Sequence, residues 1–401
     1  MKGADNAPGL VAARPPSGIP TLVGSALVVA AASAWQFYLQ AFPSTWGVFG
    51  TDLRQHLRLA HLLWEGKAYI PHPGFHFATI GLSKVSGISP PLAAVVLLTA
   101  AEVASFGITF KILSFHLASR LTRWVLVALA FSLTFVSAVY DPYFSSFIYM
   151  GQGTPNIWHS PTWIVAEPFV LWSFFETECI LREGLNSQRS ALRLSFALLM
   201  STILKPSFSV VYLPVLGILF AWKFATKRCS LRLLASIGAV VAPTVALLAI
   251  QYLARYGAAP EDGGKVIVWA PLKVWSIKSS NIAFSAALGL AFPIGVAICW
   301  PRQLLENEAL RFAWLVTLVG FLERALLAES GAWMTDGNWA WGYFFALKLI
   351  FVYSAVSLFA TYRCTSSLGN LRTAIPLLLL LLHFVSGSIY FWQMLSGGGY
   401  R

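Results

Sequence analysis

The residues best suited to chemistry follow one another in a hydrophilic stretch near the start of the chain. Asp52 and His56 lie one helical turn apart in segment 50–56 (GTDLRQH), and the polar run continues as far as Lys84. A carboxylate in this place can act as a general base that removes a proton from a hydroxyl group. His56 would share its helix face and orient the acid or contact a phosphate. Alternatively, Asp52 only stabilises the dipole at the start of a helix.

Two further histidines in the same stretch raise the question of a metal site. His72 and His76 are separated by a proline and a glycine, so they form no tight pair within one helix. Imidazole and carboxylate groups do suit transition metals. We assign no metal ligand and leave a divalent metal open as a cofactor. We interpret both histidines, with Arg54, as substrate-binding groups, and the alternative is polar packing of the loop near water.

Three basic residues fall within or beside apolar segments and are candidates for holding an anion, namely Lys205, Arg324 and Lys348. A cation at the centre of a membrane costs about 2.5 to 3.5 kcal/mol unless it is paired. We predict that Lys205 and Arg324 bind a phosphate, with Arg54 as a further contact. In the alternative interpretation, these cations pair with glutamates or extend to the interface; the glutamates are Glu167, Glu323 and Glu329.

Two polar loops have the composition of a sugar pocket. Segment 151–162 (GQGTPNIWHSPT) combines turn formers with many hydrogen-bonding groups. Segment 336–343 (DGNWAWGY) places amide, carboxylate and indole groups together, and aromatic faces suit a sugar ring. The alternative for the tryptophans is an ordinary interfacial aromatic belt. The predicted contacts are Gln152, Asn156, His159, Glu167, Asp336, Asn338, Trp339 and Trp341.

The composition places these segments in a membrane protein. Hydrophobic residues make up 57% of the chain, charged residues 11%, and the mean hydropathy is +0.68. A typical soluble domain is about 25% charged. Apolar runs of about 20 residues recur without strict alternation, which favours helices over a β-barrel. We therefore predict an all-α bundle of about eleven transmembrane spans.

The topology follows from the polar connections. We expect a cytoplasmic leader at 1–20, an uncleaved first span from about Thr21 to Phe42, and a large outer loop at 43–89 with an amphipathic helix from Thr51 to Glu65. Residues 144–162, 257–280 and 329–343 are further outer loops of one transmembrane domain, 1–401. Because Lys and Arg concentrate in the other connections, we place those in the cytoplasm.

The net charge of +12 follows this membrane bias and does not indicate a nucleic-acid partner. The four cysteines show no CxxC spacing, which argues against a zinc site. The polar outer loops all fall on one side, and no internal repeat is visible. This one-sided polarity favours a reaction at the outer surface over transport through the midplane.

The arrangement resembles the GT-C class of integral-membrane glycosyltransferases. In that class a large first outer loop begins with an acidic residue and continues into a surface helix, and Asp52 stands in the matching place. Segment 72–76 (HPGFH) matches the position of a Pro/Gly and His segment ahead of span two. Segments 151–161 and 336–343 also look like those of bacterial membrane proteins from surface-polysaccharide gene clusters. The chain lacks the paired acidic motif and the soluble C-terminal domain of many members.

The resemblance implies an inverting transferase of the bacterial inner membrane, with its active site on the periplasmic or extracellular side. It implies a polyprenyl-phosphate sugar donor, a glycan or lipid acceptor, and Asp52 as base. Three alternatives stay open from the sequence: a polysaccharide polymerase, a flippase or transporter of the lipid-linked glycan, and a structural subunit of an export complex.

Overall fold

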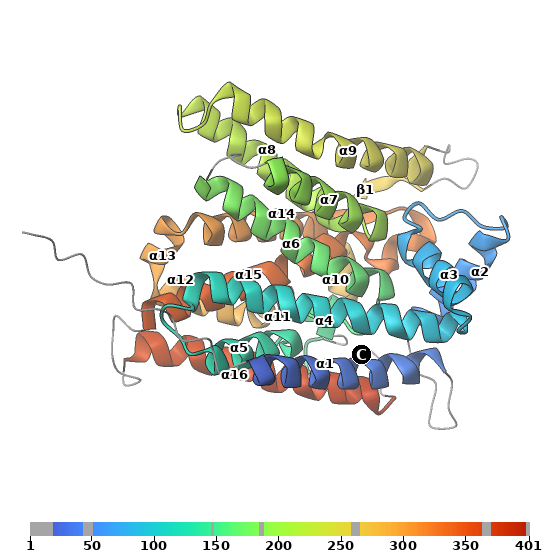
Figure 1. Ribbon diagram of the computed structural model, residues 1–401, viewed down its shortest axis with the longest axis horizontal. Helices are drawn as coiled ribbons and strands as arrows, with labels where there is room; N and C mark the ends of the chain where they lie inside the picture. The colour runs from blue at the N-terminus through green and yellow to red at the C-terminus, as the bar shows by residue number, and fades with distance from the viewer. Residues whose placement is uncertain are drawn as a thin grey trace, which may run out of the picture.

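The computed structural model describes residues 19–42, 51–145, 148–183, 188–257, 265–362 and 370–397. In these ranges the chain is almost entirely helical, with one pair of three-residue strands. Long helices lie side by side along the long axis of the molecule, while α2, α3 and the strand β1 lie at one end of it (Figure 1). The predicted all-α fold class is confirmed.

The elements divide into long helices and short connecting pieces. The long helices are α1 (Ile19–Ala41), α4 (Pro90–Leu117), α6 (Pro161–Glu183), α7 (Gln188–Leu204), α8 (Ser207–Ala225), α9 (Leu231–Tyr256), α14 (Glu308–Leu326), α15 (Trp341–Tyr362) and α16 (Leu371–Leu395). The shorter elements are α2 (Leu53–Trp64), α3 (Gly74–Ser86), α5 (Arg123–Phe135), η1 (Ile148–Gln152), β1 (Ile267–Trp269), α10 (Lys273–Lys278), α11 (Ile282–Gly289), α12 (Ala291–Cys299), α13 (Pro301–Glu306), β2 (Leu327–Glu329), η3 (Gly331–Asp336) and η4 (Asn338–Ala340).

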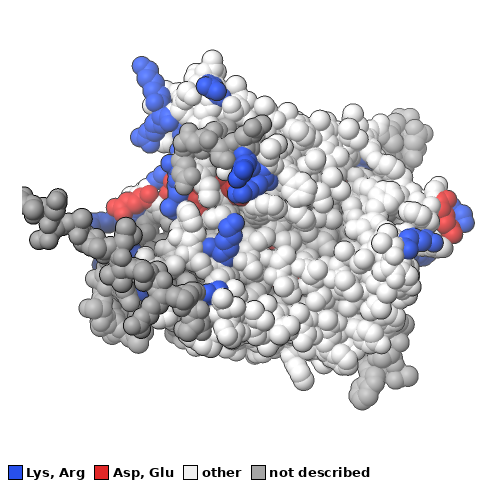
Figure 2. Space-filling model, in the orientation of Figure 1, with Lys and Arg blue, Asp and Glu red and all other residues white. Residues whose placement is uncertain are grey.

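The helices make this a multi-pass membrane protein. Six of the described helices are long and apolar enough to cross a bilayer, and α11 with α12, bent by 71° at a break, gives a seventh if the pair counts as one span. On the face shown in Figure 2, charged side chains gather towards the two ends and leave a broad uncharged band between them. The predicted count of about eleven spans is not confirmed, because α6 and α14 carry several charges and α5 is short.

The first large loop contains the predicted amphipathic helix and a second helix that was not predicted. Helix α2 buries Leu53 and Ala60 and ends before Gly66, as its apolar spacing indicates. The N-cap residue before α2 is Asp52, whereas the sequence favours Thr51 as the N-cap, and the Asp52 side chain makes no capping hydrogen bond. Segment 74–86, predicted only as part of the 43–89 outer loop, forms helix α3.

Helix α3 is held by a close approach at its first residue. A Cβ atom on Gly74 would lie 2.7 Å from the Cγ2 atom of Ile203, near the end of α7. Only glycine fits this contact without displacing Ile203. The contact therefore places the histidine-containing start of α3 beside the break between α7 and α8.

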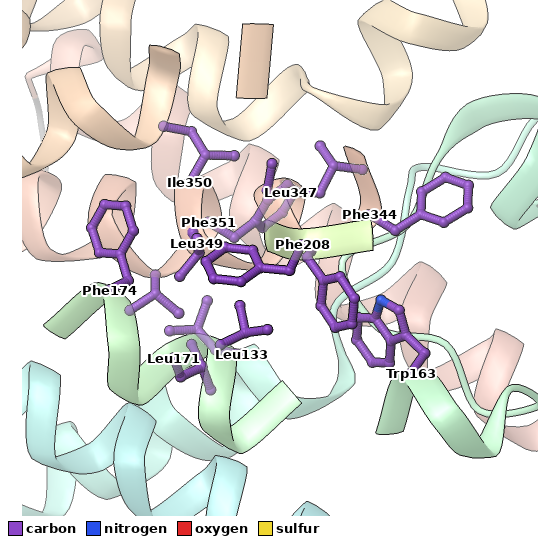
Figure 3. Close-up of a cluster of buried hydrophobic side chains, with 14 of the residues drawn as sticks. Leu133, Trp163, Leu171, Phe174, Phe208, Phe344, Leu347, Leu349, Ile350 and Phe351 are labelled. Atoms are coloured by element: carbon purple, nitrogen blue, oxygen red, sulfur yellow. The ribbon is translucent and has the colours of Figure 1, made fainter. Parts of the chain in front are cut away.

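Helix α15 forms the centre of the bundle. Every described side chain from position 341 to 358 is buried, and Figure 3 shows its apolar residues packed against neighbouring helices. Trp163 of α6 stacks on Phe345, with ring centroids 5.1 Å apart and an angle of 10° between the planes. Phe208 of α8 meets Phe345 edge-on at 6.1 Å. These contacts fix α6 and α8 against the start of α15.

The last helix, α16, packs on irregular backbone that follows α5. The buried His383 accepts a hydrogen bond at Nε2 from the backbone N–H of Phe292, 3.2 Å away. Its Nδ1 therefore carries the proton in this arrangement and donates to the carbonyl of Ser137. A Cβ atom on Gly387 would lie 1.6 Å from the carbonyl oxygen of Phe135, so the two segments are in direct backbone contact.

Candidate functional site

A cavity of about 530 Å³ lies between α8, α9 and the segment that leads into α15. One part of its wall is apolar and is formed by the two lipid-facing helices: Val210, Leu213 and Pro214 of α8, and Val245 and Leu248 of α9. Elsewhere the wall carries charged and aromatic side chains: His72, Lys205, Arg255, Glu323, Glu329, Trp339 and Trp341. The cavity can thus accommodate a molecule with an apolar tail and an anionic head.

Lys205 occupies the break between α7 and α8, where Pro206 starts the second helix. The side chain is buried, its Nζ donates to the Thr162 hydroxyl at 3.2 Å, and it lies 3.8 Å from the centre of the Trp341 ring. Burial lowers the pKa of this ammonium group to about 7, and the charge of Asp52 opposes that shift. Lys205 is therefore a cation that titrates near neutral pH at the edge of the cavity.

Asp52 is tied to the loop that precedes α6. Its backbone N–H donates to the carbonyl of His159 at 3.3 Å. The hydroxyl of Thr51 donates to Oε1 of Gln40 at 2.7 Å, and Nε2 of Gln40 donates to the carbonyl of Trp158 at 2.8 Å. These hydrogen bonds hold the start of α2 against α1 and the backbone of residues 158–159. The backbone position from which the Asp52 side chain extends is therefore fixed.

Burial raises the pKa of the Asp52 carboxyl, the charge of Lys205 opposes this effect, and the charge of Asp336 adds to it. Asp52, Lys205 and Asp336 are therefore near enough to interact electrostatically, although they are far apart in sequence. A carboxylate with a raised pKa is a stronger base than an ordinary aspartate. Asp52 is not among the residues that line the cavity, but its carboxylate can accept a proton from a hydroxyl group brought close to it.

The predicted histidines surround this region and are uncharged at neutral pH. Nδ1 of His56 and Nε2 of His76 are 2.9 Å apart, and His72 lines the cavity. Burial lowers the pKa of His72 to about 3 and that of His76 to about 4, and it lowers the pKa of His56 well below its usual value. His159 packs on Tyr149, with ring centroids 4.4 Å apart. Within the described ranges, no three His, Cys, Asp or Glu residues are placed to hold a metal ion.

Arg255 and Glu329 form a paired cluster at the cavity that the sequence reasoning did not assign as a site. Arg255 donates from Nε and Nη2 to the Glu329 carboxylate at 3.0 to 3.2 Å. Tyr256 and Asn338 also donate to Glu329, at 2.9 and 2.8 Å. Burial would raise the pKa of Glu329, but the hydrogen bond from Asn338 and the charge of Arg255 outweigh it and lower that pKa. Glu329 is thus held ionised.

Arg255 was overlooked because it ends an apolar run, where a basic residue is the normal sign of a membrane boundary. Its distance in sequence from Glu329 gave no hint of the pair. The one indication of the pair in the sequence is that Arg255 and Glu329 both lie at ends of segments predicted to face the outer side.

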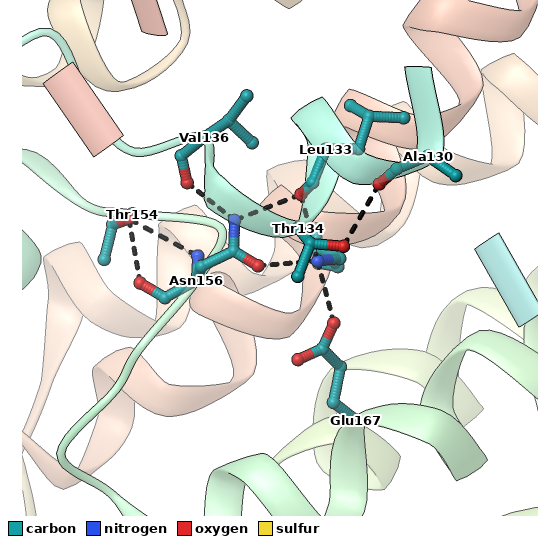
Figure 4. Close-up of polar contacts among 8 residues, drawn as sticks. Ala130, Leu133, Thr134, Val136, Thr154, Asn156 and Glu167 are labelled. Carbon is teal, nitrogen blue, oxygen red and sulfur yellow. Dashed lines mark hydrogen bonds and ion pairs between the residues drawn. The ribbon is translucent and has the colours of Figure 1, made fainter. Parts of the chain in front are cut away.

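The 151–162 loop was predicted as an outer loop lining a sugar pocket, but the structure buries it inside the bundle. Asn156 donates to the carbonyls of Leu133 and Val136, where α5 ends, at 3.2 and 2.6 Å (Figure 4). Gln152 accepts from the backbone N–H of Asp141 and donates to the carbonyl of Val139. Both amides thus satisfy backbone groups of neighbouring segments, and neither lines the cavity.

Two further predicted contacts also point into the protein. Glu167 forms an ion pair with Lys348 at 2.9 Å, and Lys348 also donates to Asn156. Arg324 donates to the carbonyls of Met150 and Gly151 at 2.6 and 3.1 Å and stacks 3.7 Å from the Trp275 ring centre. These charges therefore hold the buried loop in place. For Glu167 and Lys348 this matches the pairing alternative.

The remaining predicted residues divide between the cavity and its surroundings. Asn338, Trp339 and Trp341 line the cavity, while Asp336 is exposed nearby. Nε and Nη2 of Arg54 are buried and have no hydrogen-bond partner among the described residues. The structure thus brings the Asp52, Lys205 and 336–341 groups together and separates Gln152, Asn156 and Glu167 from them. Arg324 lines a small separate cavity together with Trp339 and does not line the large one.

Comparison with known proteins gives a distant structural likeness. No protein-family model matches the chain, and no curated protein matches it. Its fold is similar to a solved structure of the archaeal oligosaccharyltransferase AglB from Archaeoglobus fulgidus in complex with an inhibitory peptide and a dolichol-phosphate, with a TM-score of 0.43 and 13% sequence identity. The likeness covers 94% of this chain and 55% of that one. The chain thus spans about half the length of the structure it matches.

Proposed function

We propose that this protein is a membrane glycosyltransferase that moves a sugar from a polyprenyl-linked phosphate or pyrophosphate donor to a glycan or lipid acceptor. The observation that carries the proposal is the cavity between α8 and α9. It joins an apolar wall on two lipid-facing helices to a polar region with Lys205 and Arg255. Asp52 lies outside the cavity lining, and its charge acts on Lys205.

Each part of the donor has a place in this cavity. The prenyl chain lies against the apolar side chains of α8 and α9 that line the cavity. The phosphate lies at Lys205 and Arg255, because these cations can form charge-assisted hydrogen bonds to its oxygen atoms. Trp339 and Trp341 offer ring faces to the sugar.

The transfer proceeds by inverting displacement at the anomeric carbon. The acceptor oxygen forms a bond to this carbon, and the bond between the carbon and the phosphate oxygen breaks. Asp52 takes the hydroxyl proton of the acceptor, and the lipid phosphate leaves with the bonding electrons. Lys205 stabilises the negative charge that develops on the leaving phosphate oxygen.

The setting of this reaction follows the charge pattern of the chain. We place the protein in the bacterial inner membrane with the α2–α3 end on the outer side, because basic connections concentrate at the opposite end of the predicted topology. The acceptor would then reach Asp52 from the periplasmic or extracellular side.

The test compares glycans and lipids of cells that lack the protein and are complemented with wild type, Asp52→Asn or Glu65→Gln. Glu65→Gln is the matched control, since it removes a carboxylate from the far end of α2, where Glu65 pairs with exposed His61 and Lys67. Loss of a general base lowers the rate by about 10²- to 10⁴-fold. We expect sugar addition with wild type and Glu65→Gln and none with Asp52→Asn at equal protein levels.

Full complementation by Asp52→Asn would contradict the role of Asp52 and favour a polymerase. A flippase is separated by reconstitution in liposomes, because it changes the sidedness of the carrier without forming a glycosidic bond. Sidedness change with no new bond would overturn the transferase proposal.

A further inference from the structure

The turn between α8 and α9 carries positive charge that no described acidic residue balances. Helix α8 ends at Ala225 and α9 begins at Leu231. Lys227 and Arg228 lie in this turn, Arg232 lies in the first turn of α9, and all three are exposed. Among the described residues, no carboxylate comes within 4 Å of their basic groups. The turn lies at the end of the molecule opposite α2 and α3 (Figure 1).

The backbone of this turn is fixed by its own hydrogen bonds. The N–H group of Lys227 donates to the carbonyl of Phe224 at 2.9 Å, and that of Arg228 donates to the carbonyl of Lys223 at 2.7 Å. Lys227 has a φ angle of 57°, the left-handed conformation at which helices commonly end. The guanidinium of Arg228 lies 5.0 Å from the centre of the Trp222 ring. The cations are therefore presented from an ordered segment.

Lys223, in the last turn of α8, differs from these three cations. Its Nζ pairs with the Glu308 carboxylate at 2.8 Å, and its side chain is 14% exposed. The charge of Lys223 is thus balanced within the protein, while those of Lys227, Arg228 and Arg232 are open to a ligand.

The turn joins two helices that face lipid. Both α8 and α9 are long and apolar enough to cross a bilayer. The buried side chains of α9 are Ile237, Thr244 and Gln251, and most of its other side chains are open to the bilayer. Next to the three cations, Trp222 and Leu231 are 47% and 65% exposed. Indole rings favour the level of the lipid headgroups, and Lys and Arg side chains extend to the same level.

We propose that the turn between α8 and α9 binds the headgroups of anionic phospholipids. Lys227, Arg228 and Arg232 donate charge-assisted hydrogen bonds to the lipid phosphate, and the acyl chains lie against Trp222 and Leu231. A soluble anion would satisfy the cations but leave these apolar side chains uncovered. The combination of unpaired cations and exposed apolar residues therefore fits a lipid.

This site is distinct from the donor cavity. Lys205 precedes α8 and Arg255 is near the end of α9, so both lie at the opposite ends of these helices from the turn. A lipid bound at the turn therefore holds the far end of the two helices whose apolar side chains line the cavity. The site does not depend on the transferase activity.

The test measures lipid binding to the full chain. The protein in a neutral detergent is titrated with dimyristoyl phosphatidylglycerol or dimyristoyl phosphatidylcholine, and bound lipid is counted by native mass spectrometry. The two lipids share their acyl chains and differ in headgroup charge. Each basic residue near a membrane surface raises the affinity for anionic lipid about fivefold. For three such residues we expect phosphatidylglycerol to bind at least about tenfold more tightly than phosphatidylcholine.

Two combined variants separate charge from structure at the turn. Lys227→Gln, Arg228→Gln and Arg232→Gln together should reduce the preference for phosphatidylglycerol at least about tenfold. Lys227→Arg, Arg228→Lys and Arg232→Lys together keep the three charges and should retain the preference. An unchanged preference in the first variant, or its loss in the second, would overturn the proposal.

The control removes three exposed cations at the α2–α3 end of the molecule, with Arg58→Gln, Lys67→Gln and Lys84→Gln combined. This variant should keep the preference. On the face shown in Figure 2, basic side chains occur at both ends, so equal losses in the control and at the turn would mean that overall surface charge attracts the lipid, and would refute a site at the turn.

A competitor distinguishes a lipid from a soluble anion. Glycerophosphoglycerol is the phosphatidylglycerol headgroup without acyl chains, and we expect it to leave the lipid bound when both are present at equal concentration. Displacement of the lipid would show that the turn binds soluble anions, and the lipid assignment would be wrong. Equal affinity for the two phospholipids would also overturn it.

Discussion

Lys205 makes the pH dependence of donor binding predictable. Burial brings its pKa from 10.5 to about 7. A lysine is charged below its pKa, so phosphate binding should be strong below pH 7 and weaken as the pH rises through 7. Each further pH unit lowers the charged fraction about tenfold, which leaves about one lysine in a hundred charged at pH 9. Because half of the lysines are charged at pH 7, we expect kcat/KM to fall by about 50-fold between pH 7 and pH 9.

Lys205→Arg provides the decisive comparison. A guanidinium stays protonated throughout this range, because its pKa lies above about 12. The alkaline fall should therefore disappear in Lys205→Arg, whatever the absolute affinity of the variant. Binding of farnesyl methyl phosphate from pH 6 to pH 9 measures the effect without requiring turnover.

The matched control is Lys223→Arg, which changes a lysine that pairs with Glu308 outside the cavity. It should keep the wild-type profile. A flat wild-type profile, or the same alkaline fall in Lys205→Arg, would refute the assignment of the titrating group.

Three further predictions concern the base and the packing. Because the pKa of Asp52 is raised, kcat/KM should fall on acidification at a higher pH than for an ordinary aspartate, and a plateau down to pH 4 would contradict this. Gly387→Ala should destabilise the protein by about 1 to 3 kcal/mol, because the added Cβ atom would clash with the Phe135 carbonyl. Gly238→Ala is the control, since its Cβ atom would have no neighbour within 4 Å. Equal thermal midpoints of the two variants would argue against the contact. Asn156→Leu should cost about 1 to 3 kcal/mol, because the Val136 carbonyl loses the amide donor while Lys348 still donates to the Leu133 carbonyl; an unchanged midpoint would show that water replaces the amide.

The sequence was informative where local pattern decides structure. The apolar spacing from Leu53 to Trp64 predicted α2 because one face of that helix is buried. The long apolar runs predicted the helical bundle for the same reason. Helix α3 was missed because His72, Pro73 and Gly74 have the composition of a turn, while its packing against Ile203 depends on a distant helix.

The site was only partly predictable, because the type of a polar residue does not reveal which distant residue it contacts. Asn156 and Asn338 are both amides in polar segments, yet Asn156 satisfies the end of α5 and Asn338 supports Glu329 beside the cavity. Arg324 and Lys205 were both chosen as phosphate ligands, but the first is bound to backbone carbonyls and only the second lines the cavity. Such differences arise from tertiary contacts between segments far apart in the chain.

The packing of α16 has a consequence for biogenesis. The Ser137 carbonyl accepts a hydrogen bond from His383, and the Phe135 backbone packs against Gly387. Ser137 and Phe135 are synthesised much earlier than their partners in α16. Until α16 leaves the translocon, the backbone that follows α5 lacks these packing and hydrogen-bond partners. We therefore expect nascent chains released before α16 to be recognised as incomplete by membrane quality control, even though the donor cavity lies on other helices.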